Sequence, residues 1–159
     1  MKKTRKKKKF DSKFLLLAIV SVFLTAFIGS QFTDTGEWYE SIKPSITPPN
    51  YVFPIVWTTL FILIAISFYL ALISSKKEYN KKEIIPGYLF NFVLNMAWSF
   101  FFFKMKLPVL AFIDLILLWF STALLIYITQ KINKISSWLL APYLLWLSFA
   151  GILNFIIAF

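Results

Sequence analysis

Hydrophobic residues occur in five long runs separated by short polar segments. The runs cover 14–31, 53–75, 86–103, 107–130 and 135–159. Each run has about the 17–25 mainly apolar residues that an α-helix needs to cross the hydrocarbon core of a bilayer. The third run is the weakest because it contains Asn91 and Asn95, but its length and its phenylalanines favour a span. The pattern predicts an all-α fold, an integral membrane bundle of five transmembrane helices.

The polar segments divide the chain into a basic N-terminal segment, 1–13, and a transmembrane domain, 14–159. The first run is longer than the apolar part of a typical secretory signal and lacks a small-residue cleavage site, so we expect a retained helix. The segment 104–108 contains two lysines followed by Pro108. Proline is favoured at the first position of a helix, so this segment predicts a tight hairpin between antiparallel helices.

The longest polar segment, 32–52, contains Pro44, Pro48 and Pro49, which oppose a continuous helix. Trp38 and Tyr39 are residues of the kind that gather at membrane interfaces. One interpretation is an interfacial loop with an aromatic anchor. The other is a lid over a cavity, because loops on a rigid scaffold often carry function.

Basic residues are distributed unevenly between the two sides of the predicted bundle. Eight of the 17 lysines and arginines precede the first run, and with the second and fourth loops they total 14, against three on the opposite side. The positive-inside rule therefore predicts a cytoplasmic N-terminus, an extracytoplasmic loop 32–52 and an extracytoplasmic C-terminus. Basic residues beside an apolar helix are typical of a topology signal next to anionic lipid, and they do not indicate a nucleic-acid partner.

The composition restricts the chemistry as strongly as it restricts the fold. Hydrophobic residues make up 59% of the chain, more than a soluble domain of this size can bury. Cysteine and histidine are absent, which excludes disulfides, thiol nucleophiles, Cys/His metal sites and histidine-based catalytic arrangements. We therefore expect no metal and no cofactor. The abundance of Lys, Ile and Phe points to a bacterial plasma membrane.

Polar residues in the third run share one helical face. Asn91, Asn95 and Ser99 recur every four residues. Such residues usually join membrane helices through hydrogen bonds, but they also line cavities. Asp114 is the only acid within a predicted run. It either bonds to Asn91 or Asn95 or contacts a ligand or proton.

Aromatic residues also share faces, on the second run and on the fifth. The residues are Pro54, Trp57 and Phe61, and Tyr143, Trp146, Ala150 and Asn154. Bundle packing is the default interpretation of such stripes. Large rings next to the small Ala150 and Gly151 also predict a recess beside flat walls. In the first run, small residues at four-residue intervals (Ser21, Thr25 and Gly29) allow close approach, either within the bundle or in a homodimer.

Three segments resemble the TspO family of tryptophan-rich sensory proteins, which includes the mitochondrial translocator protein. They are 36–57 (GEWYESIKPSITPPNYVFPIVW), 95–101 (NMAWSFF), followed by Asp114 in the next helix, and 138–154 (WLLAPYLLWLSFAGILN). The family fold is a bundle of five membrane helices. The resemblance implies a pocket for porphyrin or another planar hydrophobic ligand. The residues that carry over are Tyr39, Pro48, Trp57, Phe61, Asn95, Trp98, Trp146 and Ala150, and we add Tyr143 and Asp114 as candidate ligand contacts.

The resemblance implies a membrane-embedded binder of tetrapyrroles that acts as a sensor, carrier or regulator. Two alternatives stay open: light-dependent porphyrin breakdown at Trp57 and Trp146, and a small transporter that uses Asp114. Family members usually have tryptophan where this chain has Ile46, so we expect an altered pocket wall there. The sterol-recognition segment of the animal proteins is not matched around residues 153–155.

The predicted topology is tested by reporter fusions in living cells. A reporter fused after Phe159 is expected to be active only outside the cytoplasm, and one inserted within 76–82 only inside, because basic loops stay cytoplasmic. Activity of both reporters on the same side would contradict the five-span prediction.

Overall fold

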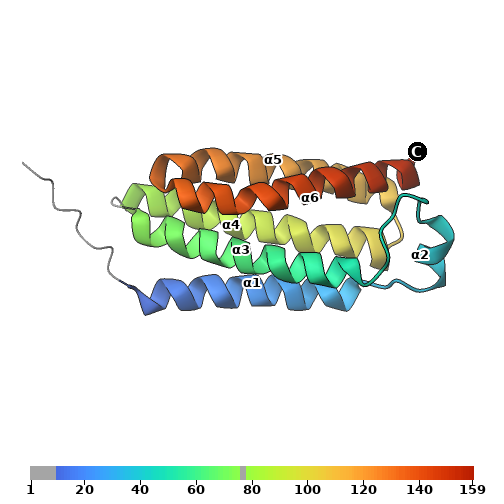
Figure 1. Cartoon of the computed structure of the whole chain (residues 1–159), viewed down its shortest axis with the longest axis horizontal. Coiled ribbons are helices and arrows are strands. Elements are labelled where there is room, and N and C mark those ends of the chain that lie inside the picture. The colour runs from blue at the N-terminus through green and yellow to red at the C-terminus, as the bar shows by residue number, and fades with distance from the viewer. Residues whose placement is uncertain (1–9, 76–77) are drawn as a thin grey trace, which may run out of the picture.

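The computed structural model describes residues 10–75 and 78–159, and this part of the chain is almost entirely helical (Figure 1). The elements are α1 (Ser12–Phe32), α2 (Glu37–Ile42), α3 (Val52–Ser74), α4 (Glu78–Ser99), the π-helix η1 (Phe100–Lys104), α5 (Pro108–Ile132) and α6 (Lys134–Ala158). Within these residues, five stretches of helix are long and apolar enough to cross a membrane. The all-α, five-span prediction is therefore confirmed. Most of the basic segment 1–13, together with Lys76 and Lys77, lies outside the described residues.

Most predicted boundaries differ from the observed ones by no more than three residues. The exception is α4, which begins at Glu78, eight residues before the predicted start, with Pro86 inside the helix. Polar residues ahead of Pro86 continue the helix beyond the apolar run, so hydropathy alone placed its start too late. The predicted hairpin is confirmed, since Pro108 is the first residue of α5. Lys106 makes this turn with a positive φ of 56°.

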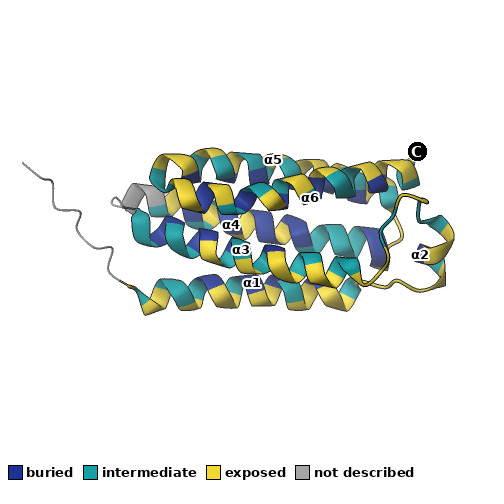
Figure 2. Cartoon of the chain, in the orientation of Figure 1, coloured by how far each residue is buried: buried dark blue, intermediate teal, exposed yellow. Residues whose placement is uncertain are grey.

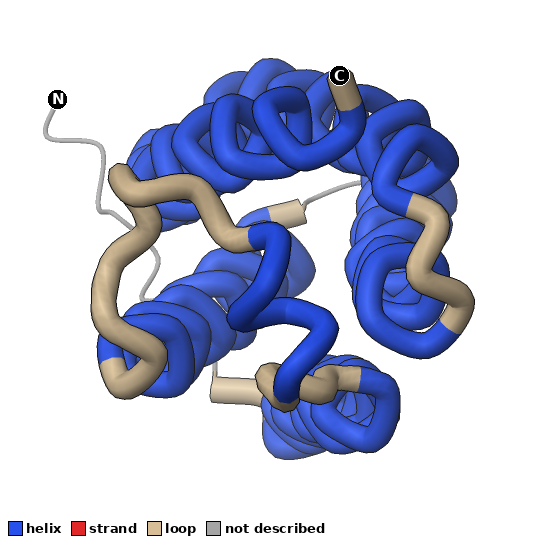
Figure 3. The backbone as a smooth tube through the Cα atoms, turned by 90° about the vertical axis from the view of Figure 1, so that its right-hand side faces the viewer, coloured by secondary structure: helices blue, strands red, loops and turns tan. Residues whose placement is uncertain are grey.

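The five long helices form a closed ring. Neighbouring pairs are α1 with α3, α3 with α6, α6 with α5, α5 with α4, and α4 with α1. The end-on view in Figure 3 shows this arrangement, with α2 and its flanking loops lying across one end of the ring. The first long helix, α1, begins at one end of the bundle, and the last, α6, ends at the other (Figure 1), as an odd number of spans requires.

Buried and exposed residues alternate along each long helix (Figure 2), and many of the exposed residues are large and apolar. Leu145 is 71% exposed and Phe120 62%, values that suit contact with lipid. The interior contains both apolar and polar groups. Far from α2, Ser67 Oγ lies 2.6 Å from Tyr88 Oη and donates to the carbonyl of Ser136 at 2.7 Å, which joins α3, α4 and α6.

Small residues of α1 pack inside the bundle. Thr25 and Gly29 are buried. A Cβ at Gly29 would lie 3.7 Å from Ser99 Oγ of α4, so α1 and α4 approach closely at this point. These residues therefore pack within the bundle, and a homodimer through them stays a prediction.

Candidate ligand-binding site

A cavity of about 570 Å³ lies at the end of the bundle that α2 covers. Its walls come from α1, α3, α4, η1 and α6, and its cover comes from α2 and the loops on either side of it. Among the described residues, α5 contributes none to the wall. The volume is within the range of about 300–1,000 Å³ that is usual for small-molecule sites.

Aromatic rings from α3 and α6 line one wall of the cavity. Trp57 packs on Phe61 of the next helical turn, with ring centroids 5.5 Å apart. Phe53 meets Trp146 of α6 edge to face at 5.8 Å. These rings come from the two aromatic stripes in the sequence, which α3 and α6 bring together because they are neighbours in the ring.

The opposite wall has a further aromatic group at the junction of α4 and η1. In η1 the backbone N–H of Met105 donates to the carbonyl of Phe100, five residues earlier, at 2.9 Å. This wider turn leaves the consecutive Phe102 and Phe103 both facing inward and buried. Trp98 stacks on Phe102 at 5.2 Å. No hydrophobic period predicts a π-helix, so neither phenylalanine was expected on the cavity wall.

Two asparagines fix the polar part of the wall. Asn95 donates from Nδ2 to Tyr143 Oη at 3.0 Å. Asn154 accepts from Trp98 Nε1 at 3.0 Å and donates to the carbonyl of Pro108 at 2.9 Å. Asn154 therefore holds the indole of Trp98 in place and connects α6 to both ends of the hairpin that joins α4 and α5.

Seven of the ten predicted contact residues lie on the cavity wall. They are Tyr39, Trp57, Phe61, Asn95, Trp98, Trp146 and Ala150. Tyr143 lies behind the wall, where its ring packs edge to face against Trp57 at 6.2 Å. Pro48 and Asp114 are not among the lining residues. Whether the seven bind a ligand stays a prediction.

The expected hydrogen bond between Asp114 and Asn91 or Asn95 is not formed. Asn91 donates to Thr122 Oγ1 at 2.9 Å, and Asn95 donates to Tyr143. Asp114 is buried, and its Oδ2 has no hydrogen-bond partner within the described residues. That interpretation was wrong because each asparagine bonds to a hydroxyl instead. The partner of Asn91 is on α5, two turns beyond Asp114, and the partner of Asn95 is on α6.

Other lining residues were missed because their roles depend on tertiary contacts. Thr25 and Gly29 line the cavity, and Gly29 also lies close to Ser99 of α4. Helical spacing predicts that small residues pack, but it does not show which of them border a space. Thr47 and Asn50 enter the wall from the loop between α2 and α3. Ile46 is 55% exposed and does not line the cavity, so the altered wall expected at this position is not found.

The segment over the cavity has a rigid side and a polar side. On the rigid side, Tyr39 is buried and its ring lies 5.7 Å from that of Phe103. Burial, followed by the charge of Glu40, raises the pKa of Tyr39. Trp38 meets Phe102 edge to face at 5.7 Å. These contacts favour the lid interpretation over a free interfacial loop.

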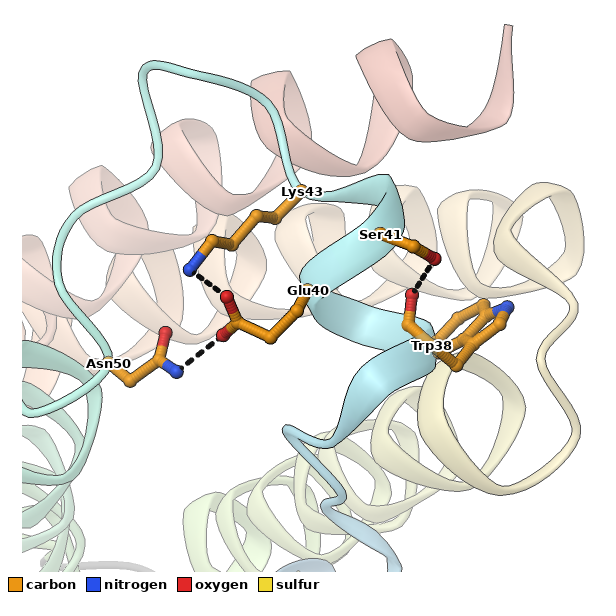
Figure 4. A network of polar contacts seen from close by, with 5 residues as sticks. All are labelled: Trp38, Glu40, Ser41, Lys43 and Asn50. Carbon is orange, nitrogen blue, oxygen red and sulfur yellow. Dashed lines mark hydrogen bonds and ion pairs between the residues drawn. The ribbon is translucent and has the colours of Figure 1, made fainter.

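The polar side of the lid is a network around one carboxylate (Figure 4). Glu40 pairs with Lys43 at 2.5 Å and accepts from Asn50 Nδ2 at 2.8 Å. Hydrogen bonds, first from Lys43 and then from Asn50, hold the pKa of Glu40 below its usual value. The network connects α2 to the residues just before α3.

The chain matches known proteins over most of its length. The model of the TspO/MBR family matches residues 15–159. The chain is 38% identical over 146 residues to the tryptophan-rich protein TspO of Chlorobaculum tepidum, covering 90% of this chain and 92% of that protein. It is 39% identical over 127 residues to the Bacillus cereus protein of the same name, covering 79% and 82%. It is 33% identical over 138 residues to the human translocator protein, covering 83% and 80%.

The role of Asn154 in positioning Trp98 is tested by replacing it with leucine. Asn154→Leu leaves Trp98 Nε1 and the Pro108 carbonyl without their buried partner, so we expect the unfolding free energy to fall by about 1–3 kcal/mol. The measurement is denaturant unfolding in detergent. Ile152→Leu on the same helix is the control, since Ile152 is 55% exposed on the outside of the bundle and its side chain forms no hydrogen bond. Equal effects in the two variants would contradict the role given to Asn154.

Proposed function

The chain belongs to the TspO/MBR family, and from the chemistry of its cavity we propose that it binds porphyrin-like tetrapyrroles within the membrane, as a sensor, carrier or regulator of their levels. The observation that carries the proposal is the cavity itself, which has flat aromatic walls from α3, α4 and α6 and a volume of about 570 Å³. Aromatic faces stack on a planar macrocycle and bury its large apolar surface.

The polar groups of the cavity suit the same class of ligand. Asn95, Ser99 and Thr25, whose side chains contain an amide or a hydroxyl, are among the residues that line the cavity. Apolar cavities with a few polar groups bind by shape and orient the ligand through those groups. The carrier role is supported by the name of the human relative, translocator protein, which matches this chain over 83% of its length.

A second candidate function is light-dependent breakdown of the bound porphyrin. It is favoured by the position of Trp57 and Trp146, two oxidisable rings on the same cavity wall. Nothing comparable favours the transporter alternative, because Asp114 does not line the cavity. We therefore keep binding as the first proposal and photochemistry as the second.

Binding is tested with a matched pair of tryptophan variants in α6. Trp146→Leu keeps the helix apolar but removes a large ring from the wall, so we expect about tenfold weaker binding of a free-base porphyrin, or about 1.4 kcal/mol. Trp138→Leu is the control, because Trp138 is 75% exposed and does not line the cavity. Affinities come from porphyrin absorbance titrations in darkness. If both variants bind as the wild type does, Trp146 has only a packing role.

Photochemistry is tested by illuminating the porphyrin complex with and without molecular oxygen as the oxidant. We expect porphyrin loss to require both light and oxygen, and to slow when Trp57 and Trp146 are both replaced by Phe, which keeps a ring but is harder to oxidise. If porphyrin persists when the wild-type complex is illuminated, the protein binds porphyrin but does not break it down. Loss in darkness would point to a different reaction.

A further inference from the structure

The cavity wall is uncharged within the described part of the chain, although many tetrapyrroles carry carboxylates. The described lining residues are aromatic, aliphatic, hydroxyl or amide residues, without Asp, Glu, Lys or Arg. A carboxylate buried against such a wall would lose its hydration without gaining an opposite charge, which is costly. If this chain binds such a ligand, as proposed above, the acidic groups are best accommodated at the edge of the cavity, where water or a cation can meet them.

The loop between α2 and α3 brings hydrogen-bond donors to that edge. Lys43 Nζ and Asn50 Nδ2 converge on one carboxylate, at 2.5 Å and 2.8 Å (Figure 4). Asn50 is itself a lining residue, so this point adjoins the cavity. Thr47, between the two donors in sequence, also lines the cavity, and its buried Oγ1 finds no partner among the described residues. The loop therefore contains a ready pair of donors and one unused hydroxyl.

The carboxylate that occupies this position belongs to the lid. Glu40 is at the surface, with its side chain 44% exposed, and Lys43 is 31% exposed. Ion pairs with this much exposure contribute little net stability, because water competes for both partners. The pKa of Glu40 is nevertheless lowered by Lys43 and Asn50, so the position favours a negative charge. An incoming carboxylate can take the place of Glu40 at small cost, since Glu40 becomes hydrated when released.

We propose that Lys43 and Asn50 form a carboxylate-binding subsite at the rim of the cavity, which Glu40 occupies until the acidic group of a ligand replaces it. Thr47 Oγ1 supplies a further donor on the cavity side. The ligand class is a planar hydrophobic acid, whose ring lies among the aromatic walls and whose carboxylate lies at the rim, beside Lys43 and Asn50. The exchange loosens the connection between α2 and the start of α3, while the contacts of Tyr39 with Phe103 hold the other side of the lid.

The other lysines at this end of the bundle do not have the same geometry. Lys106 lies over the ring of Trp38, with Nζ 5.6 Å from the centroid. Lys104 is exposed at the end of η1, and neither residue lines the cavity. A general attraction of acids to this face would involve all three lysines equally, whereas the proposed subsite depends on Lys43.

The test compares a free-base porphyrin that carries two propionic acid groups with its dimethyl ester, titrated in darkness on the full chain in detergent. For Lys43→Gln we expect about fivefold weaker binding of the acid, as for loss of one exposed ion pair, and unchanged binding of the ester. For Glu40→Gln we expect about threefold tighter binding of the acid, because its competitor is less charged, and again no change for the ester. Unchanged ester binding also shows that each variant is folded.

Lys104→Gln is the matched control, since it removes the same charge from the same end of the bundle. If Lys104→Gln and Lys43→Gln weaken binding of the acid equally, the effect is general attraction to this face and the proposal is overturned. The proposal is also overturned if Lys43→Gln weakens binding of the acid and the ester equally, because Lys43 would then be a structural part of the lid. If the wild type binds both probes and neither Lys43 nor Glu40 matters, this inference alone fails. If the wild type binds neither probe, the proposed function fails with it.

Discussion

The hydrocarbon core of a membrane offers no hydrogen-bond partners, so a polar group inside it has to find its partner within the chain. This constraint explains the helices, whose backbone groups bond internally, and also the positions of the polar side chains. Asn91 bonds to Thr122 and Asn95 to Tyr143, so the face of α4 that carries them turns towards α5 and α6. Hydrogen bonds of this kind add modest energy each, but they fix which faces meet.

The cavity follows from that arrangement of faces. The Ser67, Tyr88 and Ser136 network fills the end of the bundle away from α2 with polar contacts. Towards α2, small residues of α1 face large rings of α3, α4 and α6, which leave a space they do not fill. Asn154 keeps the indole of Trp98 against the wall by bonding to it and to Pro108. A membrane-dissolved planar ligand would thus meet walls that are already in place.

The cover of the cavity is fastened in two different ways, and the difference matters for how a ligand interacts with it. Trp38 and Tyr39 pack on the consecutive phenylalanines of η1, an apolar contact that depends on shape. Glu40 instead bonds to Lys43 and Asn50 at an exposed site. Water competes for these partners there, so the ion pair contributes little to the stability of the fold. In the proposed exchange, an acidic ligand would release the weak attachment, while the apolar contacts would keep the lid over the cavity.

Hydropathy, proline and helical spacing are local properties of the chain, so they were enough to predict the five spans, the hairpin at Pro108 and most of the aromatic residues on the wall. The sequence did not predict that Asp114 Oδ2 would lack a hydrogen-bond partner among the described residues, that Ile46 would lie away from the cavity, or that Phe102, Phe103, Thr47 and Asn50 would line it. These features depend on which helices are neighbours in the ring, on a π-helical turn that no hydrophobic period predicts, and on where the loop before α3 meets the bundle. Each arises from contacts between residues far apart in the chain, so it becomes visible only when the helices are packed together.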